Sequence, residues 1–242
     1  MDHLEVELIP VLSDNYTYLL HEPRQGVTGI VDPAVAEPVL TALARRGRRL
    51  DLVLITHHHA DHIGGLPAVK RATGCKVVGP RVDGGRIPGL DVLVGEGDRV
   101  EFGALTVQVL DTPGHTSGHV SYWFPEGEAL FCGDTLFALG CGRLLEGDAP
   151  TMWRSLGKLK ALPESTRVYC GHEYTLSNAR FALGEEPDNA ELRRRADEVE
   201  TLRAQGKPTI PSTIGLELRT NPFLRAGDAQ TFGAMRRRKD QA

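Results

Sequence analysis

Four side chains that could bind metal ions lie within six residues, in the segment Thr56-His57-His58-His59-Ala60-Asp61-His62. Imidazole nitrogens and carboxylate oxygens are ligands that divalent metals such as zinc, iron and manganese accept. In an extended segment His57 and His59 point to the same side, and Asp61 and His62 fall on the following turn. Four candidate ligands exceed the three that one tetrahedral ion with an open position requires. We therefore expect two adjacent metal ions.

A solvated run of histidines or a purification tag would be a simpler explanation of this segment. A tag would be terminal and uninterrupted, whereas this segment lies in mid-chain, contains an Asp and directly follows an apolar strand. A metal-binding role is therefore the better interpretation. His58, which stands between two candidate ligands, is expected to point away from them.

Three later segments each place one further candidate ligand after a glycine at the end of an expected strand: Gly114-His115, Gly133-Asp134 and Gly171-His172. Glycine suits a backbone that must turn sharply at that point. Taken singly, such a residue is more often a turn or cap residue. Together with the first segment, the three residues complete two sets of ligands. His119 is expected to support a ligand or the fold rather than to bind metal.

The elements that must position these residues follow from the spacing of apolar side chains. Because strands alternate with helices and several strands are apolar on both faces, the sequence predicts a layered α/β fold with helices covering the sheets. The expected helices are 37–46, 66–72, 150–162, 191–203 and 231–239, and the expected strands are 6–12, 16–21, 29–32, 52–55, 76–78, 99–102, 105–110, 120–124, 129–132 and 168–170.

The chain length of 242 residues allows one large domain with a smaller appendix. Charged residues become denser from Glu173 onward, so we predict a catalytic domain over residues 1–172 and a smaller helical domain over residues 173–242. A formal net charge of −4 argues against a nucleic-acid partner. We expect no membrane partner, because the sequence shows no signal peptide and no apolar stretch long enough to span a membrane. The scattered cysteines fit reduced, packed thiols, so we expect a cytoplasmic protein. We also expect a monomer.

The order T-H-x-H-x-D-H, Gly-His, Gly-Asp, Gly-His resembles the metallo-β-lactamase superfamily, whose fold is an αβ/βα four-layer sandwich with a dinuclear metal site at one edge of its two sheets. A narrower resemblance, covering nearly the whole chain, is to the glyoxalase II (hydroxyacylglutathione hydrolase) family. It rests on IPVLSDNY (9–16), GDTLF (133–137), GCGR (140–143), YCGHEYT (169–175), NPFLR (221–225) and MRRRKD (235–240). The last two motifs lie in the C-terminal helical unit that this family adds to the common fold.

The resemblance implies a division of labour among the candidate residues. One metal would be held by His57, His59 and His115, the second by Asp61, His62 and His172, and Asp134 would bridge both. The glutathione moiety would be bound by Arg143, Tyr174, Arg236 and Lys239. The family pattern commonly has Tyr two residues beyond the first of these, where this chain has Leu145.

The reaction implied is hydrolysis of S-(2-hydroxyacyl)glutathione thioesters, such as S-lactoylglutathione, to a 2-hydroxy acid and glutathione in methylglyoxal detoxification. A hydroxide held between two divalent ions, zinc or else iron or manganese, would be the nucleophile, with Asp134 keeping the ions close and Asp61 orienting the hydroxide. The alternatives are a mononuclear-iron persulfide dioxygenase or another thioesterase of the same fold. A nucleic-acid-processing relative would need a basic channel, and a non-catalytic metal-binding module is disfavoured because no ligand of the pattern is missing.

Overall fold

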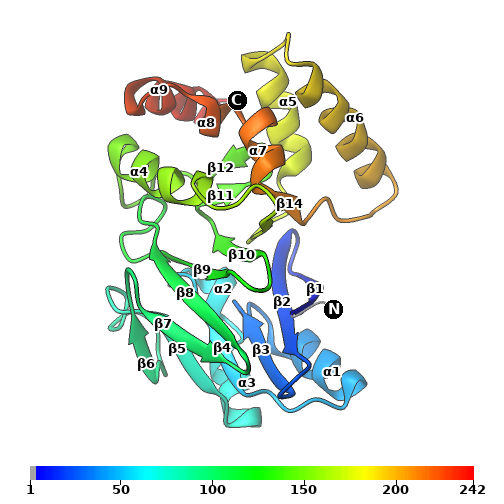
Figure 1. Ribbon diagram of the computed structural model, residues 1–242, viewed down its shortest axis with the longest axis vertical. Helices are drawn as coiled ribbons and strands as arrows, with labels where there is room; N and C mark the ends of the chain where they lie inside the picture. Colours follow the sequence, from blue (N-terminus) through cyan, green and yellow to red (C-terminus); the bar gives the residue numbers. More distant parts are fainter. Residues whose placement is uncertain (1–3) are drawn as a thin grey trace. The chain divides into compact units, whose positions relative to one another are not determined.

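The computed structural model describes residues 4–242. The chain folds into two compact units, coloured along the sequence in Figure 1. The first unit comprises Met1–Asp111, from residue 4 as described, and Gly118–Gly133, and the second comprises Thr112–Ser117 and Asp134–Ala242. Within the described chain, no helix combines the length and the apolar character needed to cross a membrane.

The first unit contains a six-stranded mixed sheet in the order β1-β2-β3-β4-β5-β6. The pairs β1–β2 and β2–β3 are antiparallel, and the pairs from β3 to β6 are parallel. All three residues of β4 are buried, as expected for an apolar strand covered on both faces. The strands are β1 (Glu5–Val11), β2 (Asn15–Glu22), β3 (Val27–Val31), β4 (Leu52–Leu54), β5 (Lys76–Pro80) and β6 (Val92–Val94).

Four antiparallel strands of the same unit follow in the order β10-β9-β8-β7. They are β7 (Arg99–Phe102), β8 (Leu105–Asp111), β9 (Val120–Phe124) and β10 (Ala129–Gly133). Tyr18 of β2 packs edge-on against Phe131 of β10, with ring centroids 5.4 Å apart. Phe131 also contacts Phe124, at 5.7 Å between centroids. This aromatic layer is the core between the two sets of strands.

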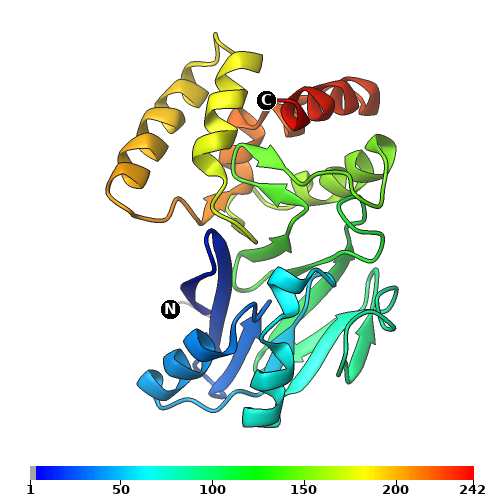
Figure 2. The same ribbon diagram turned by 180° about the vertical axis from the view of Figure 1, so that it is seen from behind.

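Three helices of the first unit, α1 (Ala36–Arg46), α2 (Ala60–Ile63) and α3 (Leu66–Thr73), lie against the outer face of the six-stranded sheet, as Figure 2 shows. Their apolar sides pack on the sheet: Val39 of α1, Val69 of α3 and Val53 of β4 are fully buried in one cluster. Residue 47, a glycine in the left-handed conformation, ends α1. Strand β4 is therefore buried between the helices on one face of its sheet and the aromatic layer on the other. The histidine segment follows the end of this strand.

The second unit is mainly helical. Its elements are β11 (Leu136–Phe137), β12 (Gly140–Cys141), α4 (Ala149–Lys160), β13 (Arg167–Cys170), α5 (Thr175–Glu185), α6 (Ala190–Ala204), β14 (Ser212–Thr213), α7 (Ile214–Thr220), α8 (Pro222–Arg225) and α9 (Ala229–Asp240). Strands β11 and β12 form a hairpin, and β13 pairs with β14, both antiparallel. Helix α5 packs on α6, and α4 packs on α9. Asp148, Asn189 and Asp228 cap α4, α6 and α9 through their side chains.

The predicted layered α/β architecture with a helical C-terminal part is confirmed. Each helix and strand expected from apolar spacing is present, with its ends displaced by at most two residues. Eight elements of the described chain were not predicted: α2, β6, β11, β12, α5, β14, α7 and α8. Most have two to four residues, which give little apolar spacing to recognise. The 11-residue helix α5 was missed for a different reason: its buried residues, Thr175, Asn178, Ala179 and Ala182, are polar or small and form no strongly apolar side.

Candidate metal centre and substrate cavity

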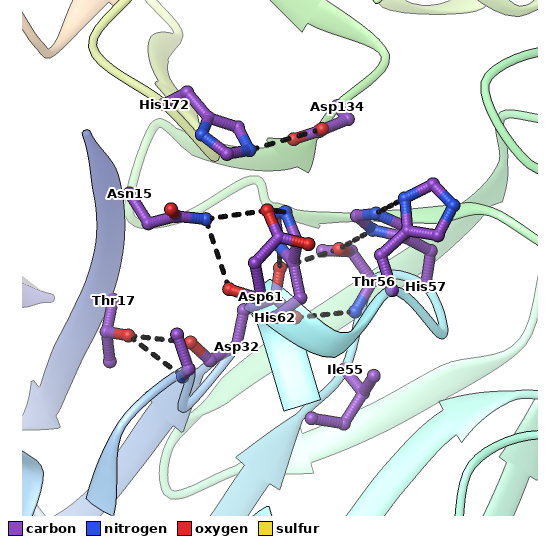
Figure 3. Close-up of polar contacts among 12 residues, drawn as sticks. Asn15, Thr17, Asp32, Ile55, Thr56, His57, Asp61, His62, Asp134 and His172 are labelled. Carbon is purple, nitrogen blue, oxygen red and sulfur yellow. Dashed lines mark hydrogen bonds and ion pairs between the residues drawn. The ribbon is translucent and has the colours of Figure 1, made fainter. Parts of the chain in front are cut away.

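The histidine segment of the first unit places its four predicted ligands just beyond the end of β4, and Figure 3 labels three of them, His57, Asp61 and His62. His57 and His62 are buried, and their ring centroids lie 4.1 Å apart. His57 Nε2 is 3.1 Å from His59 Nδ1, and His62 Nε2 is 3.8 Å from Asp61 Oδ2. The extended loop and the single turn of α2 therefore bring these nitrogens and the carboxylate together, as the spacing predicts.

A buried carboxylate that sequence reasoning missed, Asp32, supports this cluster. It follows β3 directly and accepts hydrogen bonds from Thr56 N (2.8 Å) and Thr56 Oγ1 (2.6 Å). Its Oδ2 also lies 3.0 Å from His62 Nδ1. An ionised carboxylate only accepts, so His62 carries its proton on Nδ1 and presents the lone pair of Nε2. The available signal in the sequence was an Asp at the end of an expected strand.

Strand β2 fixes the same cluster from a second side. Asn15 Nδ2 donates to the backbone oxygen of Asp61 at 3.1 Å and to its Oδ2 at 3.0 Å. Thr17 Oγ1 donates to the backbone oxygen of Asp32 at 2.6 Å. Figure 3 shows both contacts. Strand β2 therefore also orients Asp61 and Asp32.

His58 is turned toward a different partner. Its Nδ1 lies 3.2 Å from the fully buried Asp83, and Arg86 Nη2 donates to its Nε2 at 2.5 Å. This is the structural role expected for a histidine between two ligands.

His119 and Gly133 pack around the first ligand. The buried ring of His119 stacks on His57, with centroids 4.8 Å apart. Gly133 has a φ of +45°, and a Cβ there would lie 2.5 Å from Thr56 Oγ1 and 2.7 Å from His119 Nε2. No larger residue fits between these groups, which explains the glycine at the end of β10. The supporting role expected for His119 agrees with this packing.

The second unit holds the other three predicted ligands, all buried. Asp134 Oδ2 is 3.4 Å from His115 Nε2 and 3.3 Å from His172 Nε2, and Figure 3 shows the second of these contacts. His115 Nδ1 lies 2.9 Å from the backbone oxygen of Arg143. That carbonyl accepts only, so Nδ1 carries the proton and Nε2 presents its lone pair to the carboxylate side.

The donor chemistry in both units fits a divalent metal ion. In each unit, one histidine has its Nδ1 proton held by an oxygen acceptor while its Nε2 faces a carboxylate: His62 beside Asp61, and His115 beside Asp134. This arrangement orients each imidazole and directs its Nε2 toward the carboxylate, which suits coordination of a metal ion between them.

Gly142 allows the backbone to close over Asp134. A Cβ at this position would lie 1.9 Å from the backbone oxygen of Asp134 and 3.4 Å from His115 Cβ. The following residue, Arg143, is the one whose carbonyl holds His115. One close backbone approach thus sets the position of two predicted ligands.

A cavity of about 350 Å³ in the second unit contains all the predicted substrate-binding residues. Its lining includes the predicted ligands His115 and Asp134 together with Arg143, Tyr174, Arg236 and Lys239. The ring of Tyr174 stacks on His172, with centroids 4.6 Å apart and planes within 6°. A volume of this size falls in the range of small-molecule sites.

The basic side chains of the cavity differ in how firmly they are held. Arg236 is only 4% exposed; it donates to the backbone oxygen of Cys141 at 2.8 Å and pairs with Asp240 at 3.0 Å. Lys239 Nζ donates to the backbone oxygen and the hydroxyl of Ser177, each at 3.1 Å. Burial, helped by the charge of Arg236, lowers the pKa of Lys239. Arg143 is exposed.

Leu145, where the family pattern commonly has Tyr, is 53% exposed. It is not among the described residues that line this cavity. The loop from residue 143 to 147 is held instead by Glu146, whose N–H donates to the backbone oxygen of His115 at 3.2 Å.

The four cysteines are all buried, as the packing interpretation predicts. Burial raises the pKa of Cys141 to about 11 and raises that of Cys170 further. Cys170 Sγ donates to the backbone oxygen of His172 at 3.3 Å. A thiol that stays protonated at neutral pH is a poor nucleophile, so these side chains do not support a cysteine mechanism.

Comparison with known proteins gives two adjoining family matches. Residues 13–172 match the metallo-beta-lactamase superfamily, and residues 173–242 match the hydroxyacylglutathione hydrolase C-terminus. The chain is 56% identical to the hydroxyacylglutathione hydrolase of Methylococcus capsulatus over 98% of each chain. It is 54% identical to that of Rhodospirillum rubrum, over 96% of this chain and 92% of the relative. A solved structure of ETHE1 from Myxococcus xanthus superposes with a TM-score of 0.75 at 30% identity, covering 96% of this chain and 90% of that one.

Proposed function

Because the chain belongs to the hydroxyacylglutathione hydrolase family of the metallo-β-lactamase superfamily, we propose that it hydrolyses S-(2-hydroxyacyl)glutathione thioesters. A representative substrate is S-lactoylglutathione, and the products are a 2-hydroxy acid and glutathione, as in methylglyoxal detoxification. The observation that carries this proposal is the cavity in which the ligands His115 and Asp134 share one wall with basic and aromatic side chains.

The proposed cofactor is a pair of divalent ions, zinc or else iron or manganese. The donor chemistry supports metal binding in each unit. When bound, such ions lower the pKa of water and polarise the thioester carbonyl. The residues proposed to hold them are His57, His59 and His115 for one ion, Asp61, His62 and His172 for the other, and Asp134 for both.

The chain's own contribution is to fix the groups around the reacting carbonyl. Asn15 holds Asp61 through its Oδ2, so this carboxylate has a defined direction in which to orient an attacking water. Asp134 Oδ2 lies 3.4 Å from His115 Nε2 and 3.3 Å from His172 Nε2, so these three groups are close enough to bind a metal ion together. A thiolate is a good leaving group, so the reaction needs no strong general acid from the protein.

Glutathione thioesters carry carboxylates, and we propose that Arg143, Arg236 and Lys239 bind them while Tyr174 contacts the peptide. The support is that all four side chains line one cavity. Arg236 is already held by Cys141 and Asp240, so it acts as a fixed positive charge rather than a mobile one. The proposal includes residues 1–172 as the catalytic domain, of which 1–3 lie outside the described residues, and 173–242 as the substrate-binding domain.

The partner proposed is this small molecule alone, with neither nucleic acid nor membrane, and the protein is proposed to be a cytoplasmic monomer. Size-exclusion chromatography with light scattering tests the monomer, and cell fractionation tests the compartment.

The proposal is tested by a thioesterase assay and metal analysis on the same preparation. We expect hydrolysis of S-lactoylglutathione and close to two metal ions per chain. One iron per chain with persulfide-dependent oxygen uptake and no thioester hydrolysis would contradict the proposal. Lys239→Met should raise KM more than it lowers kcat, whereas Lys207→Met, which changes an exposed lysine outside the cavity, should leave both unchanged.

A further inference from the structure

The tip of the β11–β12 hairpin is held by three side chains from the helical part of the second unit. Asn178 Nδ2 donates to the backbone oxygen of residue 138 at 3.1 Å. Asn221 Nδ2 donates to the backbone oxygens of residues 137 and 140, at 3.2 and 3.0 Å. Glu217 Oε2 accepts from Leu139 N at 2.8 Å. We call Asn178, Glu217 and Asn221 the hairpin cradle.

Glu217 is the centre of the hairpin cradle and is fully buried. Besides Leu139 N, its Oε2 accepts from Asn221 Nδ2 at 2.9 Å, and its Oε1 accepts from the hydroxyl of Ser212. Burying a carboxylate is costly unless hydrogen bonds compensate. Of the three bonds that Glu217 accepts, one comes from the hairpin itself, at Leu139, and one from Asn221, which also holds the hairpin. The third comes from Ser212. The proposed catalytic chemistry makes no use of Glu217.

The hairpin tip itself is strained and cannot hold its position unaided. Leu139 has a φ of +58°, a left-handed conformation that is unfavourable for a residue with a side chain. Its side chain is fully buried in a cluster with residues 179, 182, 192 and 196. The surroundings therefore impose this conformation, and strain of this kind persists only where neighbouring contacts over-determine it.

Both ends of the hairpin reach the cavity. Phe137 and Cys141 line it, and the backbone oxygen of Cys141 accepts from Arg236. Two residues further on, the backbone oxygen of Arg143 holds His115. The hairpin cradle thus fixes the part of the cavity lining that includes Phe137 and the backbone oxygen that accepts from Arg236. Through the residues that follow, it also fixes the backbone oxygen that holds His115.

We propose that Glu217, acting through Leu139 N and Asn221, is a positioning residue for the substrate cavity. It sets the position of the β11–β12 hairpin and hence of Phe137 and Cys141, which flank the basic side chains. This proposal rests on the function proposed above, because it assigns the cavity to the thioester. Since the contacts affected lie in the substrate cavity, loss of Glu217 should act more on KM than on kcat.

The test compares three variants at α7 and its end. Glu217→Leu keeps a side chain of similar length but leaves Leu139 N without its acceptor and removes one of the three acceptors of the Asn221 amide. Glu217→Gln keeps an oxygen for these two donors and can donate to Ser212 instead of accepting from it. Thr220→Val is the matched control, because this residue is fully buried on the same helix and its hydroxyl donates to the helix's own Leu216.

We expect Glu217→Leu to raise KM for S-lactoylglutathione about tenfold with kcat changed less than about twofold. Glu217→Gln should restore KM to within about twofold of the unchanged protein, and Thr220→Val should leave KM unchanged while lowering the melting temperature. Equal effects of Glu217→Leu and Thr220→Val on KM would overturn the proposal, as would a folded Glu217→Leu with normal KM.

A second variant and a second measurement do not depend on that outcome. If Glu217→Leu does not fold, Asn221→Asp keeps the helix cap to Phe223 N but places an oxygen against two backbone oxygens and Glu217. Amide hydrogen exchange of the peptide over 136–143 should be faster in this variant than in Thr220→Val. Unchanged exchange overturns the proposal even if the thioester is hydrolysed. Faster exchange in a protein without thioesterase activity supports the positioning of the hairpin and refutes only the proposed function.

Discussion

Asp32→Asn is predicted to weaken metal binding by changing which nitrogen of His62 carries the proton. Thr56 N can only donate, so the amide oxygen of Asn must face it, and the NH₂ group then takes the place of Asp32 Oδ2. There it faces His62 Nδ1, which must accept. The proton of His62 consequently moves to Nε2, the nitrogen that lies toward Asp61 and that a metal would need.

The expected size follows from the two bonds involved. The change replaces charge-assisted bonds at 2.6 Å and 3.0 Å by neutral ones and forces the wrong tautomer. Losing the oxygen partner of a metal-binding histidine costs about 10- to 100-fold in metal affinity, or about 1.4 to 2.8 kcal/mol. The metal-free protein should also lose about 1 to 3 kcal/mol of its free energy of unfolding, because a buried donor and acceptor are mismatched.

The assay is metal retention in competition with a chelator, with urea unfolding of the metal-free protein measured in parallel. The matched control is Asp51→Asn. Asp51 also accepts from a backbone N–H, that of Thr28 at 3.0 Å, and it stands at the other end of β4, directly before the strand. This control should lose some stability without losing metal. Wild-type metal affinity in Asp32→Asn, or an equal loss in Asp51→Asn, would refute the reasoning about the tautomer.

Three further changes test other parts of the site. Gly142→Ala should cost about 3 kcal/mol or more of unfolding free energy, because its Cβ would lie 1.9 Å from the backbone oxygen of Asp134; a urea midpoint within error of the unchanged protein would contradict this. Asp134→Ala should abolish thioester hydrolysis and lower the metal content measured by elemental analysis, and retained turnover would exclude it as a shared ligand. Burial and the charge of Arg236 hold the pKa of Lys239 below its ordinary value of 10.5. Lys239 therefore loses its positive charge as the pH rises through that lowered pKa. KM for the anionic thioester should therefore rise with pH before 10.5 is reached, and Lys239→Arg should flatten the rise; a profile identical in both proteins would remove Lys239 from substrate binding.

The sequence indicated the segments that carry the proposed ligands because several local signals coincide in them. The segment over 56–62 places polar residues after an apolar strand, and a period of two aligns His57 with His59. Likewise, a helix was expected over residues 191–203, within α6, because this segment is strongly charged with few apolar positions, as suits an exposed helix. In these places the local sequence and the final structure impose the same requirement.

The groups that hold the ligands were not predictable in the same way. Asp32 is a single polar residue after a strand, and its role depends on β3 and β4 lying parallel, which the local sequence does not encode. Glu217 lies on a seven-residue helix and meets Leu139, which is 78 residues away in the sequence. Such roles arise from contacts distant in the chain, and without the fold each of these residues has the appearance of an ordinary charged side chain.

The contacts inside the second unit also limit how its C-terminal segment could be recombined with other proteins. Although the second family match begins at residue 173, several elements of that segment have partners upstream of it. Strand β14 pairs with β13, α9 packs on α4, and Glu217 and Asn221 hold the β11–β12 hairpin. Grafted alone onto another scaffold, residues 173–242 would leave β14 without its partner strand and Glu217 without the N–H group of Leu139. A fragment that keeps all these partners must therefore begin before β11. A gene fusion that joined at 173 would carry Tyr174, Arg236 and Lys239 without Arg143 and without the β11–β12 hairpin.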